Sequence, residues 1–285
     1  MGRPSTSARW IGAPLLGLVL ALSLGACNGG GSDDDGPGAA SSPTATPPPT
    51  ATAAPAPADD ACYRLDFEEA VSPTSTTEPR ACARSHTAET YQVGRVDNVE
   101  DGHLLAIDSD RVQDQVAQTC RGAFGAAVGG DEVQQRLSML RPVWFTPTLE
   151  QSDTGADWYR CDLVALLGGD RLTPLTDSLR GVLDTPEGRE RYGMCGTAAP
   201  DADDFERVPC RLEHSWRAVD VVPLAPAAGG AYPGADVARE AGQQQCEDAG
   251  RAAAADPLDF DWGYEFPEAD QWDNGQTFGR CWVPD

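Results

Sequence analysis

The chain has 285 residues, and its 45 acidic and 21 basic residues give a formal net charge of −24. All of the basic residues are arginine. Such acidity argues against nucleic-acid binding, for which a basic patch is the expected footprint, and against lying flat on an anionic lipid surface.

The first 26 residues have the pattern of an export signal. Two arginines precede an apolar run at 11–24, which is too short for a comfortable transmembrane span and is typical of a signal-peptide core. An alanine stands directly before Cys27, as in the bacterial lipobox. We therefore predict a lipoprotein signal peptide at 1–26 and a lipid anchor of palmitate-type acyl chains on Cys27. An ordinary secreted cysteine is the alternative.

Residues 27–60 continue as a segment rich in proline, threonine and alanine, with seven prolines. A segment of this composition buries no core, and its prolines keep it extended. We expect a disordered stalk with a reach on the order of 100 Å. It would hold the rest of the chain at the extracytoplasmic face of the cell membrane, either as a bare linker or with glycosylated hydroxyl groups.

Eight of the nine cysteines follow the stalk, and they fall into two sets of four. An even number of cysteines in an exported chain indicates a disulfide framework, because nothing outside the membrane keeps thiols reduced. The spacing within the two sets is similar, which suggests an internal duplication. The first set is Cys62, Cys82, Cys120 and Cys161, and the second is Cys195, Cys210, Cys246 and Cys281.

The residues around the cysteines support the duplication. His86 and His214 each stand four residues after the second cysteine of their set. Apolar residues follow each histidine with the alternation of a strand. The segments 144–161 and 264–281 align without a gap and share proline, glutamine, aspartate, glycine, arginine and cysteine at matching positions. We therefore predict two tandem repeats, 61–171 and 194–285.

Each third cysteine lies late in a helical pattern. In the first repeat, apolar residues recur every four positions within 108–124, after acidic caps. The counterpart at 232–255 has fewer large apolar residues but is rich in alanine, which favours a helix. Each unit is therefore expected to be strand, strand, helix, strand. The predicted fold class is α+β, with two homologous disulfide-stapled repeats that are each a small antiparallel sheet with one main helix.

The connection at 172–193 carries leucines and a valine with helical spacing. Leu172, Leu175, Leu179 and Val182 would share one face of a helix. We predict a short linking helix across 172–193, packed between the two repeats.

The order of cysteines and markers resembles the actinobacterial septum-formation family of cell-envelope proteins. In that family a cysteine-bearing strand is followed by Cys-x-x-Pro-His, a helix with a cysteine, and a closing segment with Pro, Trp, Gly and Cys. The resemblance implies a membrane-attached envelope protein linked to cell division. The closing segment is present as Pro267, Trp272, Gly275 and Cys281, and in the first repeat as Pro147, Gly155 and Cys161, with Ser152 in place of the tryptophan. The proline before the histidine is replaced by Ser85 and by Glu213.

Four cysteines allow three pairings in each repeat. We favour the first with the second and the third with the fourth. The first kind of bridge would tie adjacent strands, and the second would staple the helix to the closing strand. Bridges closing loops of this size contribute roughly 2–4 kcal/mol each. The favoured pairs are Cys62–Cys82, Cys120–Cys161, Cys195–Cys210 and Cys246–Cys281.

The repeated Cys-x-x-x-His pattern could also indicate a metal site or a Cys/His nucleophile. A Cys₂His₂ zinc site would need both repeats to converge and would leave two cysteines without disulfide partners. A nucleophile needs a free thiolate, which a bridged cysteine cannot provide. We therefore expect no metal, no cofactor and no catalytic residue here. His86 and His214 remain as structural hydrogen-bonding residues or as candidates for binding.

The segment 259–275 mixes carboxylates with aromatic residues. Rings beside acids are typical of a face that binds carbohydrate or peptidoglycan, so Trp262, Tyr264 and Trp272 are candidate binding residues. Tyr264 and Trp272 also occupy positions of the repeat framework, which favours core packing for them.

These observations favour a non-enzymatic interaction module in the cell envelope, anchored by lipid and linked to septum formation. Its partners would be envelope or division proteins or cell-wall glycan, and not nucleic acid. One alternative is a secreted hydrolase that acts on the cell wall through carboxylates near 259–273. Another is a purely structural surface protein.

Overall fold

The computed structural model describes residues 51–285. The signal peptide at 1–26, the lipidation site Cys27 and the stalk up to residue 50 lie outside the described residues. The last ten residues of the expected stalk are more ordered than the composition predicts. Asp59 accepts a hydrogen bond from the backbone N–H of Val93 at 3.1 Å, and Ala54 packs against the edge of the core. None of the helices within 51–285 has the length and hydrophobicity needed to cross a bilayer.

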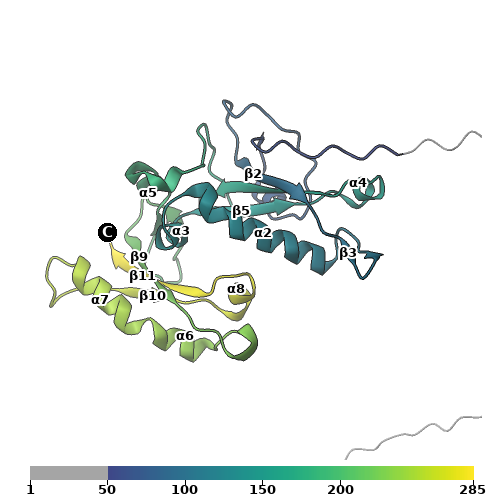
Figure 1. Cartoon of the computed structure of the whole chain (residues 1–285). Helices are drawn as coiled ribbons and strands as arrows, with labels where there is room; N and C mark the ends of the chain where they lie inside the picture. The colour runs from purple at the N-terminus through teal and green to yellow at the C-terminus, as the bar shows by residue number, and fades with distance from the viewer. Residues whose placement is uncertain (1–50) are drawn as a thin grey trace, which may run out of the picture. The chain divides into compact units, whose positions relative to one another are not determined.

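The first sheet is antiparallel and has four strands in the order β1-β2-β6-β5, of which β2 and β5 are labelled in Figure 1. One long helix, α2 (Asp110–Val128), packs on it and buries Val112, Val116 and Cys120 against the sheet. This is the helix that the four-residue spacing predicts, extended by one turn. The strands are β1 (Cys62–Tyr63), β2 (Ala88–Arg95), β5 (Leu140–Phe145) and β6 (Trp158–Ala165).

The second sheet has five antiparallel strands in the order β10-β11-β9-β7-β8. Apart from the edge strand β8, the order along the chain is the same in both sheets: first, second, fourth, third. A closing strand therefore lies in the middle of each sheet, beside the longest strand. The strands are β7 (Met194–Gly196), β8 (Arg207–Pro209), β9 (Trp216–Pro223), β10 (Gly263–Glu265) and β11 (Phe278–Pro284).

The helical segment of the second half is divided into two helices, where the sequence predicted one. α6 (Ala235–Ala241) and α7 (Gln243–Ala253) meet at Gly242. The hydroxyl group of Tyr264 donates to the carbonyl of Ala238 at 3.0 Å, the acceptor that residue 242 would use in a continuous helix. A Cβ atom at position 242 would lie 2.1 Å from the Tyr264 ring, so only glycine allows this close approach.

Short elements complete the fold. α4 and α8 each precede a closing strand, and each begins with a capping box whose third helical residue is a glutamine, Gln151 or Gln271. These glutamines are a pair that the alignment of the two repeats matches. The short elements are α1 (Phe67–Ala70), β3 (Val99–Glu100), β4 (His103–Leu104), α3 (Glu132–Arg136), α4 (Leu149–Asp153), α8 (Ala269–Asp273) and the 3₁₀ turns η1 (Val182–Asp184) and η2 (Ala228–Gly230).

The predicted linking helix at 172–193 is wrong over most of its length. Only α5 (Pro186–Tyr192) is α-helical, and it begins where Pro186 supplies a helix start and Thr185 caps the first turn. Leu172 and Leu175 are instead extended, and Leu175 exchanges backbone hydrogen bonds with His86. The leucines are still buried, because an extended strap over the core hides apolar residues as well as a helix does.

Backbone and core contacts join the halves through the segment before β5. Met139 N–H donates to Tyr192 O at 2.7 Å, and Met194 N–H donates to Leu137 O at 2.8 Å. Met139 and Met194 then pack with Trp282 in one small core. The fold is thus α+β, built from small antiparallel sheets with several helices, as the sequence predicts at that level.

Candidate functional site

The structure contains four disulfides, and they join the pairs that the sequence analysis favours. Cys120–Cys161 and Cys246–Cys281 connect a helix to the closing strand of the same half, with Cα atoms 5.4 and 4.8 Å apart. The other two bridges tie the first strand of each half, β1 or β7, to the loop that precedes β2 or β9. They are Cys62–Cys82 and Cys195–Cys210.

His86 is buried, with 1% of its surface exposed. Its Nδ1 atom lies 2.9 Å from the carbonyl oxygen of Arg84, and its Nε2 atom has no hydrogen-bond partner among the described residues. The histidine therefore closes the turn after Cys82 and faces the interior. It is not placed to meet a partner in solution.

Like His86, His214 contacts a backbone carbonyl through its Nδ1 atom, but its Nε2 atom has a partner. Its Nδ1 atom lies 2.6 Å from the carbonyl oxygen of Leu212, and its Nε2 atom lies 3.0 Å from Oδ2 of Asp285. Burial acts to raise the pKa of Asp285, but hydrogen bonds from Arg217 and His214 hold it below its usual value. Cys195 lies close enough to join His214 and Asp285 in a three-ligand cluster, but its sulfur is bonded to another cysteine and is not a thiolate ligand.

The predicted aromatic binding residues lie in the core of the second half. Trp272 is 6% exposed, and its indole N–H donates to Gly230 O at 3.1 Å. Tyr264 and Trp262 are partly buried against the same core. The structure therefore places all three rings in one core cluster, and for Tyr264 and Trp272 this is the alternative that the repeat framework favours.

Among the carboxylates of 259–273, that of Glu265 is largely buried and held by cations. Glu265 in β10 accepts from Arg280 at 2.9 Å and from the indole N–H of Trp282 at 3.2 Å, and Arg207 binds it through two nitrogen atoms. Burial acts to raise the pKa of Glu265, but Arg280 and Arg207 lower it below its usual value. A carboxylate held ionised in this way is a poor proton donor.

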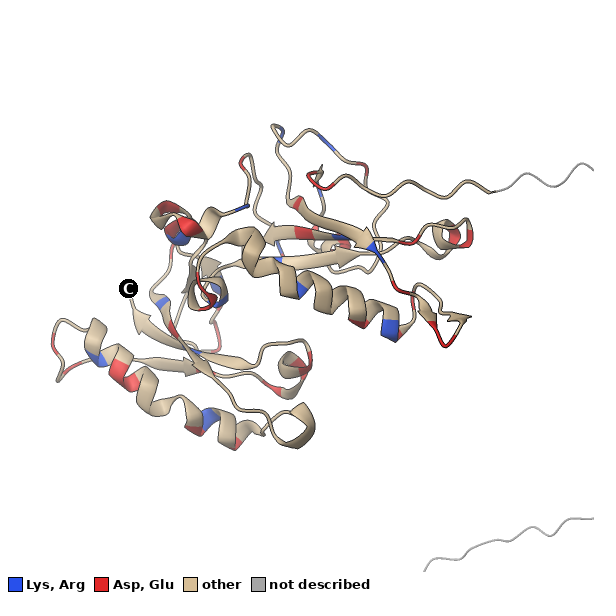
Figure 2. Cartoon of the chain, in the orientation of Figure 1, with Lys and Arg blue, Asp and Glu red and all other residues tan. Residues whose placement is uncertain are grey.

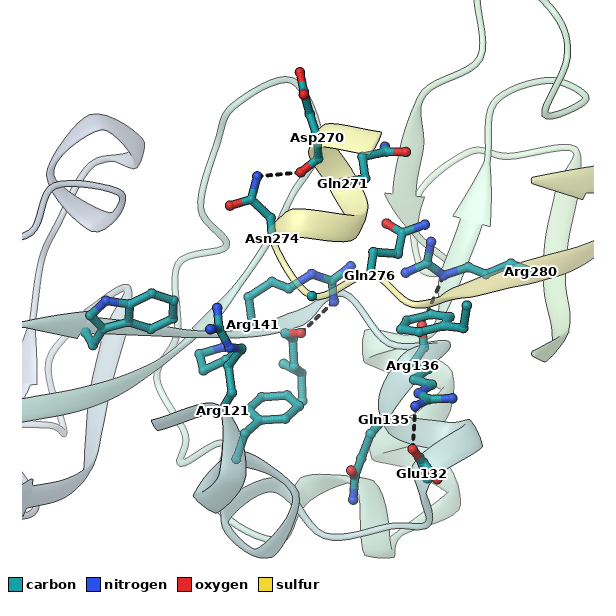
Figure 3. Close-up of a pocket in the computed structure, with 16 residues that line it drawn as sticks. Arg121, Glu132, Gln135, Arg136, Arg141, Asp270, Gln271, Asn274, Gln276 and Arg280 are labelled. Atoms are coloured by element: carbon teal, nitrogen blue, oxygen red, sulfur yellow. Dashed lines mark hydrogen bonds and ion pairs between the residues drawn. The ribbon is translucent and has the colours of Figure 1, made fainter. Parts of the chain in front are cut away.

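A cleft that the sequence did not predict is lined in part by Arg280, one of the arginines that bind Glu265 (Figure 3). It has a volume of about 550 Å³ and is lined by the second half of α2, by α3 and β5, and by the α8–β11 connection. Apolar side chains, including Phe124, Leu140 and Trp144, supply much of its wall. Its charged side chains are Arg121, Arg136, Arg141, Arg280, Glu132 and Asp270.

The excess of arginine in this cleft runs against the composition of the chain. The cleft has four cations and two acids, whereas the whole chain has more than twice as many acids as bases. Figure 2 shows acidic residues along the helices and loops of both halves. A local positive site on a chain of net charge −24 focuses a field that attracts small anions.

The arginines of the cleft differ in how they are compensated. Arg280 is bound to Glu265, and Arg136 is paired with Glu132 and stacked on the Phe278 ring at 4.4 Å. Arg121 lies over the Trp144 ring at 5.3 Å and has no ion pair among the described residues. Aromatic stacking holds both guanidinium planes in place, and it leaves the edge of Arg121 free for a ligand.

Arg141 is the more buried of the two arginines in the cleft that have no ion pair among the described residues. Its Nη1 atom donates to the backbone carbonyls of Ser138 at 2.8 Å and Leu140 at 2.6 Å, but no acid within 51–285 forms an ion pair with it. Burial, followed by repulsion from Arg280 and Arg207, lowers the pKa of Arg141 to about 9. It therefore stays charged at neutral pH.

Sequence reasoning missed the cleft because its parts are far apart in the chain. Arg141 and Arg280 are about half the chain length apart, and each stands in an ordinary strand pattern. No spacing rule indicates which arginines lack an acidic partner. That depends on the contact between the segment before β5 and the second half.

Comparison with known proteins gives a family match. The family model described as septum formation matches residues 138–281, which is just over half of the chain. The match begins just before β5 and ends at Cys281, so it includes the β5 and α8–β11 parts of the cleft wall but not the α2 and α3 parts. No curated protein and no solved structure matches the chain. Because the family model covers half of the chain, the protein belongs to the septum-formation family.

Proposed function

We propose that the protein is a lipid-anchored module of the cell envelope that takes part in septum formation by binding a partner in the arginine-lined cleft. Membership of the septum-formation family supports the link to division. Four disulfides support an extracytoplasmic location, because such bridges persist only in oxidising compartments. The lipobox at Cys27 and the proline-rich segment after it support an anchor and a stalk of 27–60.

We also propose that the two halves, 61–171 and 194–285, arose by duplication. The common strand order, the equivalent disulfides and the helix-to-strand staple support this origin. In both halves a histidine contacts the carbonyl oxygen two residues before it. The cleft does not follow the symmetry of the two halves. The first half contributes α2, α3 and β5 to its wall, whereas the second half contributes α8 and β11.

The observation that carries the binding role is the excess of uncompensated guanidinium groups in the cleft. A purely structural protein gains nothing from a half-buried arginine without an acid, because desolvating a charge costs free energy. A hydrolase using carboxylates near 259–273 would need a proton donor and a second acid. Glu265 has a lowered pKa and is bound to two arginines, which weighs against that reaction.

Complementation of depleted cells tests the proposal. Depletion of the chain should reduce the number of septa per cell length, and the wild-type chain should restore it. Arg141→Met and the unanchored Cys27→Ala should not restore it, although both are exported. Arg95→Met, which alters an exposed residue outside the cleft, is the matched control and should restore septation. Full restoration by Arg141→Met would exclude the cleft as the functional site.

A further inference from the structure

Three guanidinium groups and one carboxylate lie within electrostatic reach of one another, and two of the arginines, Arg141 and Arg280, line the cleft. Arg207 and Arg280 bind Glu265 directly, and the field of both reaches Arg141. Glu265 is 10% exposed and Arg280 is 4% exposed at the side chain, so solvent screens this group weakly. Three positive charges and one negative charge leave a local excess that an anionic ligand would offset.

The free atoms at this place are hydrogen-bond donors. Nε and Nη2 of Arg141 make no hydrogen bond to any described residue. A side-chain hydrogen bond from the Gln276 amide helps to lower the pKa of Glu265, and the buried Nε2 atom of that amide has no other partner within 51–285, so one of its two N–H groups stays free. A buried donor without a partner costs roughly 1–3 kcal/mol. Arg141 and Gln276 line the same cleft, so a ligand there could satisfy both (Figure 3).

We propose that Arg141 and Gln276 bind a carboxylate group of a short peptide, with Arg121 and Trp144 contacting the rest of that peptide. The planar fork of a guanidinium matches a carboxylate with two parallel hydrogen bonds. The amide of Gln276 adds a third donor to the same group. This inference names the ligand class of the site in the proposed function and rests on that function.

The size and composition of the cleft favour a short peptide over other anions. A volume of about 550 Å³ is in the range of small-ligand pockets and holds only a few amino-acid residues. Phe124, Leu140 and Trp144 offer apolar walls for a backbone and small side chains. A long polyanion would meet the net charge of −24 outside the cleft, whereas a peptide with one or two carboxylates would not.

Calorimetric titration of the purified full chain tests the proposal and the source of the carboxylate. The probes are an acetylated tetra-alanine peptide with a free C-terminal carboxylate, the same peptide as its amide, an amidated peptide carrying two glutamates, and inorganic phosphate. We expect at least one carboxylate-bearing peptide to bind and the uncharged amide not to bind. Binding of the first peptide identifies a chain terminus as the ligand group, and binding of the third identifies acidic side chains.

The variants decide whether binding occurs in the cleft. Arg141→Met should weaken binding by about 10- to 100-fold. Gln276→Glu changes little in volume and should abolish binding by repulsion, while Arg121→Met, at an exposed position, should weaken it up to about fivefold. Arg95→Met should bind as the wild type does. Circular dichroism checks that each variant is folded.

The proposal is overturned if no carboxylate peptide binds or if Gln276→Glu and Arg121→Met both bind as the wild type does. Phosphate that binds as tightly as the peptides, with the same dependence on Gln276, would overturn the ligand class. A failure of these titrations together with loss of septation in Arg141→Met would remove the carboxylate ligand and leave the proposed function standing. Restored septation in Arg141→Met would contradict the function itself.

Discussion

Replacing Glu265 by glutamine should destabilise the protein through the arginines that it leaves behind. Glu265 is bound by Arg207, Arg280 and Trp282, and Arg280 is almost fully buried. Removing one partner of a buried ion pair costs about 3–5 kcal/mol, because the remaining charge has no counterion. The amide oxygen of the glutamine still accepts one hydrogen bond, so we expect the lower end, a loss of about 3 kcal/mol in the free energy of unfolding.

The effect of Glu265→Gln should depend on pH with a definite sign. The pKa of Glu265 in the folded protein is below its usual value of 4.5. Its carboxylate therefore stabilises the fold fully above the unfolded pKa, and this stabilisation is lost as the pH falls through the folded pKa. The difference between wild type and variant should be largest at pH 7 and should shrink below about pH 4.5.

Urea denaturation followed by tryptophan fluorescence, with the disulfides intact, measures this difference at pH 7 and pH 3.5. Glu132→Gln is the control, because Glu132 pairs with Arg136 on α3 at an exposed position with 72% of its side chain in solvent. It should change the free energy of unfolding by no more than about 0.5 kcal/mol. A Glu265→Gln variant within that limit of wild type at pH 7, or a loss that does not shrink on acidification, would refute the reasoning.

Three further predictions concern stability, and urea or thermal denaturation checks each of them. Replacing Cys120 and Cys161 by alanine removes a disulfide with a sequence separation of 41 residues, and the loop-entropy relation predicts a loss of about 4 kcal/mol in the free energy of unfolding. A loss below about 1 kcal/mol would show that this constraint on the unfolded chain is unimportant. Burial raises the pKa of Asp162 to about 6, so the ionisation of this residue should lower the free energy of unfolding as the pH rises from about 4 to above 6. Asp162→Asn should remove this decline in stability. A decline that is unchanged in the variant would mean that another group causes it. Gly242→Ala should lower the free energy of unfolding by about 1–3 kcal/mol, because its Cβ atom would meet the ring of Tyr264. The control Gly122→Ala, in open space on α2, should raise the free energy of unfolding by about 0.5–1 kcal/mol. Equal effects of the two substitutions would contradict the steric argument.

Several features of the fold could be predicted because they depend on local residue spacing or on the number and order of the cysteines. A four-residue apolar spacing is enough for α2, since that face must meet a sheet. The pairing of the cysteines follows from placing one cysteine on a helix and the next on the strand that covers it. The prediction of a linking helix was wrong because the spacing of leucines shows only that these residues are buried, not that the backbone is helical. Leu172 and Leu175 are buried in an extended segment, in which Leu175 pairs with the backbone of His86.

Equivalent positions in the two halves show that the sequence pattern does not determine the electrostatic environment of a residue. Arg160 and Arg280 align in the closing strands and are both buried. Arg160 lies over the Tyr63 ring at 3.7 Å and pairs with Asp162, two residues along its own strand. Arg280 pairs with Glu265 from the neighbouring strand, so the two acids have opposite pKa shifts. The same arginine in the same pattern thus serves two electrostatic environments.

The sequence by itself determined the pairing of the eight cysteines and the position of α2, because both follow from spacings along the chain, and the export pattern with Cys27 stays a prediction. Only the tertiary structure decided that Arg141 would stand beside Arg207 and Arg280 with one carboxylate among them. The physical reason is that the charge state and the free hydrogen-bond donors of a site depend on distance and burial. Contacts between segments more than a hundred residues apart set both in this protein.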